Sequence, residues 1–365
     1  MEGVTLAHDN EGWQARDRHA GGDKMEKPKG ILTVTGMIDL AQFWPTGTSD
    51  ADTAKIIVHV VGPSSFTFQK TPGAPAKPTS AFAGAFMKGS DSVDKKTGKK
   101  RKPKMVISSK SQITVRLQGI DAPELHYRPP RGHINLRQHF GESATIGLAT
   151  FLKTFGTGAL PCRVFTRVNK PNDVFDKYGR FVGDIVVSKG GKDVNINHWL
   201  VEQGWAFPTF YDSMMVQEIR KLTAAARTAQ NKKRNIWTAQ GYTSDIGTLD
   251  RTLKTRPAGS KPANDKGAVI IPKFFRRQYT WFIEDPAKKD LKAFLLKPGN
   301  KDTFVLTAAY LKFIDQKGPK PPNIKLGNAI DDANKIIQGP ADFVIHEAPS
   351  TLVKGNNVPV TGWGG

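Results

Sequence analysis

The sequence predicts an α+β protein: a small barrel of five strands with three helices, followed by a smaller β-rich region at the C-terminal end. Five short β-branched or alternating segments and three segments with helical apolar spacing support this class. Their order is three strands, one helix, two strands and two helices, within a chain of 365 residues.

The predicted strands are short and bounded by turn residues. In the third, Ile113, Val115 and Leu117 alternate with polar residues, which places Arg116 on the polar face. Strands are expected at residues 31–35, 54–61, 105–119, 162–168 and 181–187. Helices are expected at residues 142–155, 196–203 and 213–235. The pattern suits the oligonucleotide/oligosaccharide-binding (OB-fold) barrel, but it does not exclude another α+β fold.

Composition shifts divide the chain into segments. Proline, glycine, serine and lysine are abundant in residues 62–104, and eight basic against two acidic residues occur from Lys88 to Lys104. This insertion is predicted to be a flexible loop, either simply solvated or acting as an electrostatic arm. The expected segments are a disordered polar arm at 1–28, a barrel domain at 29–237, a linker at 238–266, and a C-terminal accessory domain at 267–365.

The charge balance indicates a polyanionic partner. The formal net charge is +21, and without a basic amphipathic helix nucleic acid is favoured over a membrane. Cys162 is the only cysteine, which excludes an intrachain disulfide. No signal-peptide pattern and no run of about 18 apolar residues occurs, so a cytoplasmic protein or export by a non-Sec route is expected.

Charged residues gather around the end of the third predicted strand. Arg116 is followed by Asp121 and Glu124, while Arg180 closes a turn at 176–180 and Asp52 precedes the second strand. Guanidinium groups bind phosphate oxygens bidentately, and carboxylates bind hard divalent cations or accept a proton from water. These residue types suit phosphodiester hydrolysis.

Five segments in order resemble the staphylococcal nuclease family over residues 30–237. Residues 116–124 are similar to its R-x-x-x-x-D-x-P-E motif, and residues 176–180 match its D-K-Y-G-R turn. Residues 139–144, 201–206 and 234–237 resemble the start or ends of its helices. The resemblance implies the five-stranded barrel and a calcium-dependent nuclease of low sequence specificity that acts on DNA or RNA.

The resemblance also implies roles for individual residues. Glu124 would be the general base, and Arg116 and Arg180 would stabilise the phosphate. Lys177 and Tyr178 would contact a flanking phosphate. Aromatic residues such as Phe210 and Tyr211 would lie beside a base, although core packing is an equally good interpretation of them.

Calcium would be bound by the side chains of Asp52 and Asp121 and by the carbonyl of Ala122. The family's D-G-D-T segment is altered, because Ala51 stands where glycine is usual. If that glycine needs a positive φ, alanine adds strain of about 1 kcal/mol. The loop at 125–138 is also long and contains histidines and arginines, so it is either a mobile surface loop or an arm that grips substrate.

Two functions remain open at this point. The first is the nuclease, and the alternative is a catalytically weak nucleic-acid-binding module, which would not need the full set of arginines and carboxylates. The C-terminal region could contact a protein partner. Its basic and aromatic segment at 268–284 is expected to be a packed strand, with single-strand binding as the alternative.

Overall fold

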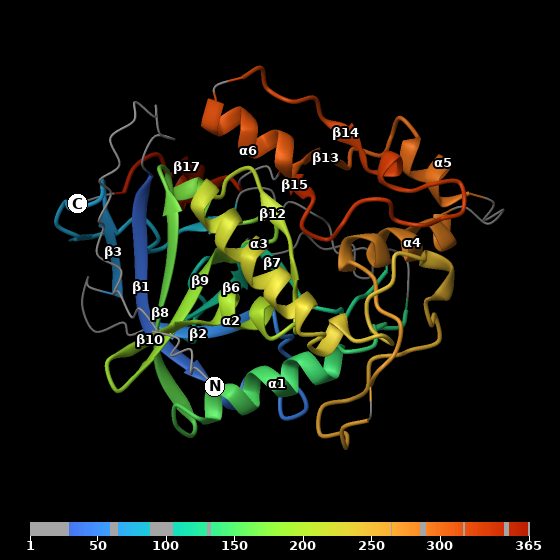
Figure 1. Cartoon of the computed structure of the whole chain (residues 1–365). Coiled ribbons are helices and arrows are strands. Elements are labelled where there is room, and N and C mark those ends of the chain that lie inside the picture. Colours follow the sequence, from blue (N-terminus) through green and yellow to red (C-terminus); the bar gives the residue numbers. More distant parts are fainter. Residues whose placement is uncertain are drawn as a thin grey trace, which may run out of the picture.

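A closed barrel of five strands forms one half of the structure (Figure 1). The computed structural model describes residues 29–58, 65–87, 105–129, 133–263, 265–284, 290–316, 318–346 and 350–363. The barrel strands are β1 (Gly30–Asp39), β2 (Thr53–Val58), β6 (Gln112–Leu117), β8 (Ala159–Val168) and β9 (Phe181–Lys189). β6 and β9 are parallel, the other neighbours are antiparallel, and β8 closes the circle by pairing with both β1 and β9. These strands confirm the predicted α+β barrel.

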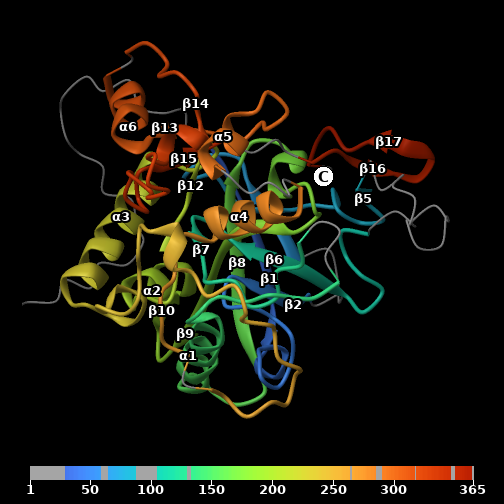
Figure 2. The same cartoon turned by 90° about the vertical axis from the view of Figure 1, so that its right-hand side faces the viewer.

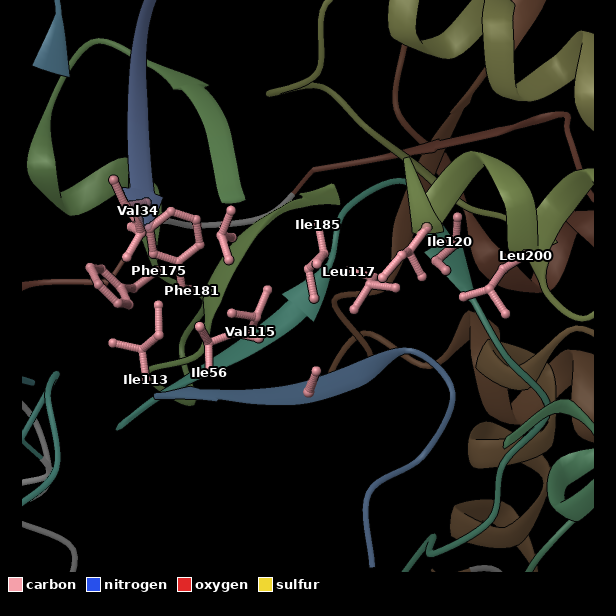
Figure 3. Close-up of a cluster of buried hydrophobic side chains, with 14 of the residues drawn as sticks. Val34, Ile56, Ile113, Val115, Leu117, Ile120, Phe175, Phe181, Ile185 and Leu200 are labelled. Carbon is pink, nitrogen blue, oxygen red and sulfur yellow. The ribbon is translucent and has the colours of Figure 1, made fainter. Parts of the chain in front are cut away.

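Apolar side chains fill the barrel because alternate residues of each strand point inward (Figure 3). Val34 of β1, Ile56 of β2, Val115 of β6, and Phe181 and Ile185 of β9 have no exposed surface. Each such side chain contributes about 1.5–3 kcal/mol relative to its exposed state. The core therefore fixes the ends of the strands, where the charged residues lie.

The three predicted helices are present as α1 (Gly141–Lys153), α2 (Ile196–Glu202) and α3 (Val216–Asn231). α3 buries Ile219, Leu222 and Ala226, at the spacing of one helical face. β10 (Lys192–Asn195) forms a hairpin with β9 and leads into α2. None of the helices in the described ranges is both long and apolar enough to cross a membrane.

Part of the insertion is folded, so the prediction of a flexible loop is wrong for residues 65–87. β3 (Phe66–Gln69) pairs with β1, β4 (Lys77–Pro78) pairs with β3, and β5 (Phe86–Met87) follows. Phe82, at 1 % exposure, anchors the segment in the core. The basic stretch 88–104 and the arm 1–28 lie outside the described residues.

The C-terminal region mixes helices with short strands. It contains α4 (Pro272–Glu284), β13 (Thr303–Leu306), α6 (Thr307–Gln316), β15 (Phe343–Ile345) and β16 (Leu352–Lys354). It also contains α5 (Leu291–Leu296), β14 (Ile324–Lys325) and β17 (Val358–Pro359). The strand expected at 268–284 is wrong, since α4 occupies most of it. Aromatic composition favours strands, but burial of Phe274, Phe275, Gln278 and Trp281 follows helical spacing.

The C-terminal region packs on the barrel domain through two shared cores. β15 runs parallel to β12 (Phe210–Tyr211), and β16 pairs with β5. One core joins the barrel to Val344 and Leu352, while the other joins Phe140 and Phe207 to α4. The segment 238–266, which was expected to be a linker, also contacts the barrel domain, because Arg256 forms an ion pair with Glu142 of α1.

Replacing Phe274 by Ala tests whether the regions share a core. Phe274 is 1 % exposed and packs against Phe343, with ring centroids 5.7 Å apart. We expect a loss of about 3–5 kcal/mol in the free energy of unfolding, measured by denaturant titration, within one transition for the whole chain. Ile337→Ala, at a position 56 % exposed, is the control and should change stability by less than about 0.5 kcal/mol. A separate early transition with an unchanged barrel would contradict the shared core.

Candidate active site

Strand register brings an arginine and a carboxylate together at one end of the barrel. Arg116 of β6 lies opposite Thr53 of β2 and Val182 of β9. Asp52, directly before β2, therefore lies beside it, and the Asp52 carbonyl accepts a hydrogen bond from the Leu117 N–H at 2.9 Å. Arg116 and Asp52 are only 7 % and 9 % exposed, so the polar face of β6 is covered by protein.

A turn at Gly119 redirects the chain from β6 into β7 (Ile120–Asp121). Gly119 has φ of +76°, and a Cβ there would lie 2.5 Å from Leu222 Cδ1, so only glycine fits. β7 then pairs with β11 (Phe207–Pro208), which holds Asp121 at 1 % exposure. The Asp121 carboxylate lies 3.8 Å from Nη2 of Arg116.

Gln138 fixes the loop that presents Glu124. Its side-chain oxygen accepts a hydrogen bond from the Glu124 N–H at 3.1 Å, and its own N–H donates to the Glu124 carbonyl at 2.7 Å. The Gln138 amide also donates to the carbonyl of Ile270 at 2.9 Å. Gln138 is buried, so this one side chain links Glu124 to the residues that lead into α4.

An arginine of α4 completes the cluster, and the sequence did not predict it. Nη2 of Arg276 donates to Oδ2 of Asp121 at 2.8 Å and Nη1 donates to Oδ1 at 3.3 Å. Nη1 also pairs with Oε1 of Glu124. Figure 2 shows α4 in front of β6 and β7, at the end of the barrel. The basic and aromatic run at 268–284 was the only signal, and the strand expected there gave no reason to place Arg276 at this site.

Tyr211 of β12 holds Arg116 from another side. Its hydroxyl accepts a hydrogen bond from Nη2 of Arg116 at 3.0 Å, and both groups are buried. Phe210 beside it has no exposed surface and packs in the core. The packing alternative therefore accounts for Phe210, whereas Tyr211 contacts the charged cluster.

Burial and incomplete pairing set the protonation of the three carboxyl groups. Burial raises the pKa of Asp52 to about 6 and that of Glu124 to about 7, although Arg116 and Arg276 respectively oppose the change. Burial acts in the same direction on Asp121, but the guanidinium groups of Arg276 and Arg116 hold its pKa below the ordinary value. Asp52 and Glu124 are therefore the groups of this cluster that bind a proton most readily, whereas Asp121 stays ionised.

The turn at 176–180 places a second arginine and an exposed aromatic ring near the cluster. Gly179 has φ of +74°, and the buried carboxylate of Asp176 accepts from the backbone N–H and from Nε of Arg180 at 2.9 and 2.7 Å. Tyr178 is 61 % exposed, with Nζ of Lys177 5.1 Å from its ring centroid. Arg180 also acts electrostatically on Asp52, which places its charge within range of the site.

The described parts of the loop 125–138 are packed against the protein, so the alternative of a mobile surface loop does not describe them. His126 lies 2.5 Å from the carboxylate of Asp50, and Arg137 is buried with Nη1 2.5 Å from Asp265. Tyr127 pairs with Leu136 across the loop. Residues 130–132 lie outside the described ranges.

The donors predicted for calcium have suitable chemistry but are already engaged. Asp52 and Asp121 offer carboxylate oxygens, and the Ala122 N–H donates to Oδ2 of Asp52 at 3.3 Å, which brings that backbone to the cluster. Both oxygens of Asp121 are bonded to Arg276. In the described ranges no three His, Cys, Asp or Glu side chains are arranged as metal ligands. A calcium ion on Asp121 would therefore lie beside the Arg276 guanidinium, and the two cations would repel each other.

The comparison with known families identifies one part of the chain. Residues 114–239 match the family model described as staphylococcal nuclease homologue. The matched range contains Arg116, Asp121, Glu124 and Arg180, but neither Asp52 nor Arg276. No curated protein matches the chain.

Replacing Glu124 by Gln should remove part of the pH dependence of stability. The raised pKa means that the folded protein binds this proton more tightly than the unfolded chain does. The resulting stabilisation is complete below the ordinary pKa of 4.5 and is lost as the pH rises through about 7. We expect the wild type to lose on the order of 1–3 kcal/mol relative to Glu124→Gln between these pH values.

Denaturant titrations at several pH values, with a chelator present, measure this difference. A stability difference that is constant with pH would show that Glu124 has its ordinary pKa in the folded state, and one that grows in favour of the wild type as the pH rises would show a lowered pKa. Either result would contradict the prediction.

Proposed function

We propose that this chain hydrolyses phosphodiester bonds of DNA or RNA with low sequence specificity, from the premise that residues 114–239 match the family model of staphylococcal nuclease homologues. The observation that carries the proposal is the grouping of the buried Arg116 and Asp121 with the half-buried Glu124 at one end of the barrel. A guanidinium and two carboxylates in one place are what hydrolysis of an anionic ester requires.

Glu124 is the general base in this proposal. Its pKa of about 7 suits acceptance of a proton from water near neutral pH. The water oxygen attacks phosphorus, the proton passes to Glu124, and the bond from phosphorus to the leaving oxygen breaks. The position of Glu124 is supported by two hydrogen bonds of its backbone, one to the side chain and one to the backbone of Gln138.

Arg116 and Arg180 bind the phosphate. Tyr211 and Asp176 orient their guanidinium groups through hydrogen bonds, which lowers the entropy lost when substrate binds. Lys177 and the exposed Tyr178 lie beside Arg180 in sequence and would contact a flanking phosphate. The net charge of +21 supports a nucleic-acid partner.

Calcium is the proposed cofactor, held by Asp52, Asp121 and the carbonyl of Ala122. A bound divalent cation would supply positive charge that neutralises the phosphate. With Arg276 in place, the pKa of Asp52 is still raised, which supports a need for further positive charge in this cluster.

One observation favours the alternative of a catalytically weak nucleic-acid-binding module. Arg276 pairs with both Asp121 and Glu124, the proposed metal ligand and the proposed base. If that pairing persists when nucleic acid is bound, the protein binds its substrate without cutting it.

Digestion of plasmid DNA, single-stranded DNA and RNA, each with calcium, magnesium or a chelator, tests the proposal. We expect calcium-dependent cleavage by the wild type and a loss of about 10²–10⁴-fold in Glu124→Gln, because the general base is gone. Glu202→Gln, at an exposed carboxylate of α2 whose side chain is 40 % exposed, is the matched control and should cleave normally.

Two results would contradict the nuclease. Equal cleavage by wild type and Glu124→Gln would exclude Glu124 as the base. Tight binding of nucleic acid without cleavage in any metal would replace the nuclease by the binding module.

A further inference from the structure

Arg276 occupies the position of a cation in the candidate active site. Its guanidinium bridges the two oxygens of Asp121 and one oxygen of Glu124. Asp121 is 1 % exposed, so a nearby positive charge must compensate its negative charge. Either a metal ion or a basic side chain can supply that charge. In this structure a side chain from the C-terminal region, more than 150 residues away in sequence, meets that need.

The backbone of α4 is fixed in place around Arg276. Phe274 and Phe275 are buried in the core shared with the barrel domain. The Arg276 carbonyl accepts a hydrogen bond from the Tyr127 hydroxyl at 3.0 Å. The neighbouring Arg277 and Lys273 instead bind Asp302, with Nζ of Lys273 at 3.2 Å. Among the described contacts of α4, Arg276 is therefore the one basic side chain that contacts the acidic cluster.

The side chain itself can move without the helix. The Arg276 side chain keeps 30 % of its surface exposed, whereas Asp121 beneath it is sealed. A change of its rotamers would carry the guanidinium into solvent and leave the core around Phe274 and Phe275 intact. Breaking the contact therefore requires the movement of one side chain and not of the helix.

We propose that Arg276 competes with a divalent cation for Asp121, and thereby sets the calcium concentration at which the site becomes loaded. The guanidinium and the metal ion would compensate the same negative charge of Asp121. A metal ion on Asp121 would lie beside the guanidinium, and repulsion between the two cations would drive Arg276 away. The functional consequence of this competition rests on the proposed function, since binding of the metal ion would activate the nuclease. The competition itself concerns binding alone.

Isothermal titration calorimetry with calcium, on the full chain without nucleic acid, tests the competition. We expect Arg276→Gln to bind calcium at least about tenfold more tightly than the wild type, because no side-chain cation must leave. Arg277→Gln, an identical change one residue away that faces Asp302, is the matched control and should bind calcium as the wild type does.

Arg276→Lys is a second test variant, which is needed if Arg276→Gln does not fold. Thermal melting shows whether each variant is folded. Lysine keeps the charge but cannot form the two-pronged contact, so its calcium affinity should lie between those of wild type and Arg276→Gln. Equal affinity in wild type, Arg276→Gln and Arg276→Lys would overturn the proposal, including the case in which none of them binds calcium. If the wild type cleaves no nucleic acid, the proposed function fails, whereas the affinity comparison still decides the competition.

Discussion

Three carboxylates lie at one end of the barrel, and compensation of their charge determines how this part of the molecule is built. Asp52 directly precedes β2, Asp121 ends β7, and Glu124 lies in the loop that follows β7. Burying each carboxylate without a nearby positive charge would cost several kcal/mol. Arg116 and Arg276 supply the opposing charge, and the raised pKa values of Asp52 and Glu124 show that the compensation is incomplete.

This constraint ties the C-terminal region to the barrel domain. α4 contributes apolar side chains to a core that includes Phe140 and Phe207, and it contributes Arg276 to the acidic cluster. Gln138 adds a third connection, because it bonds both to Glu124 and to the carbonyl of Ile270. The candidate site and the added region therefore form one structural unit (Figure 2).

Local patterns in the sequence were enough to predict the barrel. Strand alternation and helical spacing are short-range signals, so β6, α1 and the turn before Arg180 could be located from the residues themselves. Segment 116–124 also predicted that Arg116, Asp121 and Glu124 would lie close together. Contacts between distant segments gave no such signal. The pairing of Arg276 with Asp121, and of β3 with β1, depends on tertiary packing that composition does not encode.

Aromatic residues were the main source of error. Their abundance in 268–284 favoured a strand, because aromatic side chains are common in sheets, yet their positions followed the helical period. In residues 65–87, proline and glycine indicated a loop, but Phe66 and Phe82 supplied enough apolar surface for ordered strands. Composition alone therefore gave the wrong prediction in both segments.

The most direct test is a crystal structure with a short, non-hydrolysable single-stranded oligonucleotide and calcium. A phosphate bound by the guanidinium groups of Arg116 and Arg180, with Glu124 beside it, would establish this end of the barrel as a phosphodiester site. An oligonucleotide bound elsewhere, with Arg116 still hydrogen-bonded to Tyr211 and no phosphate between the two arginines, would contradict it.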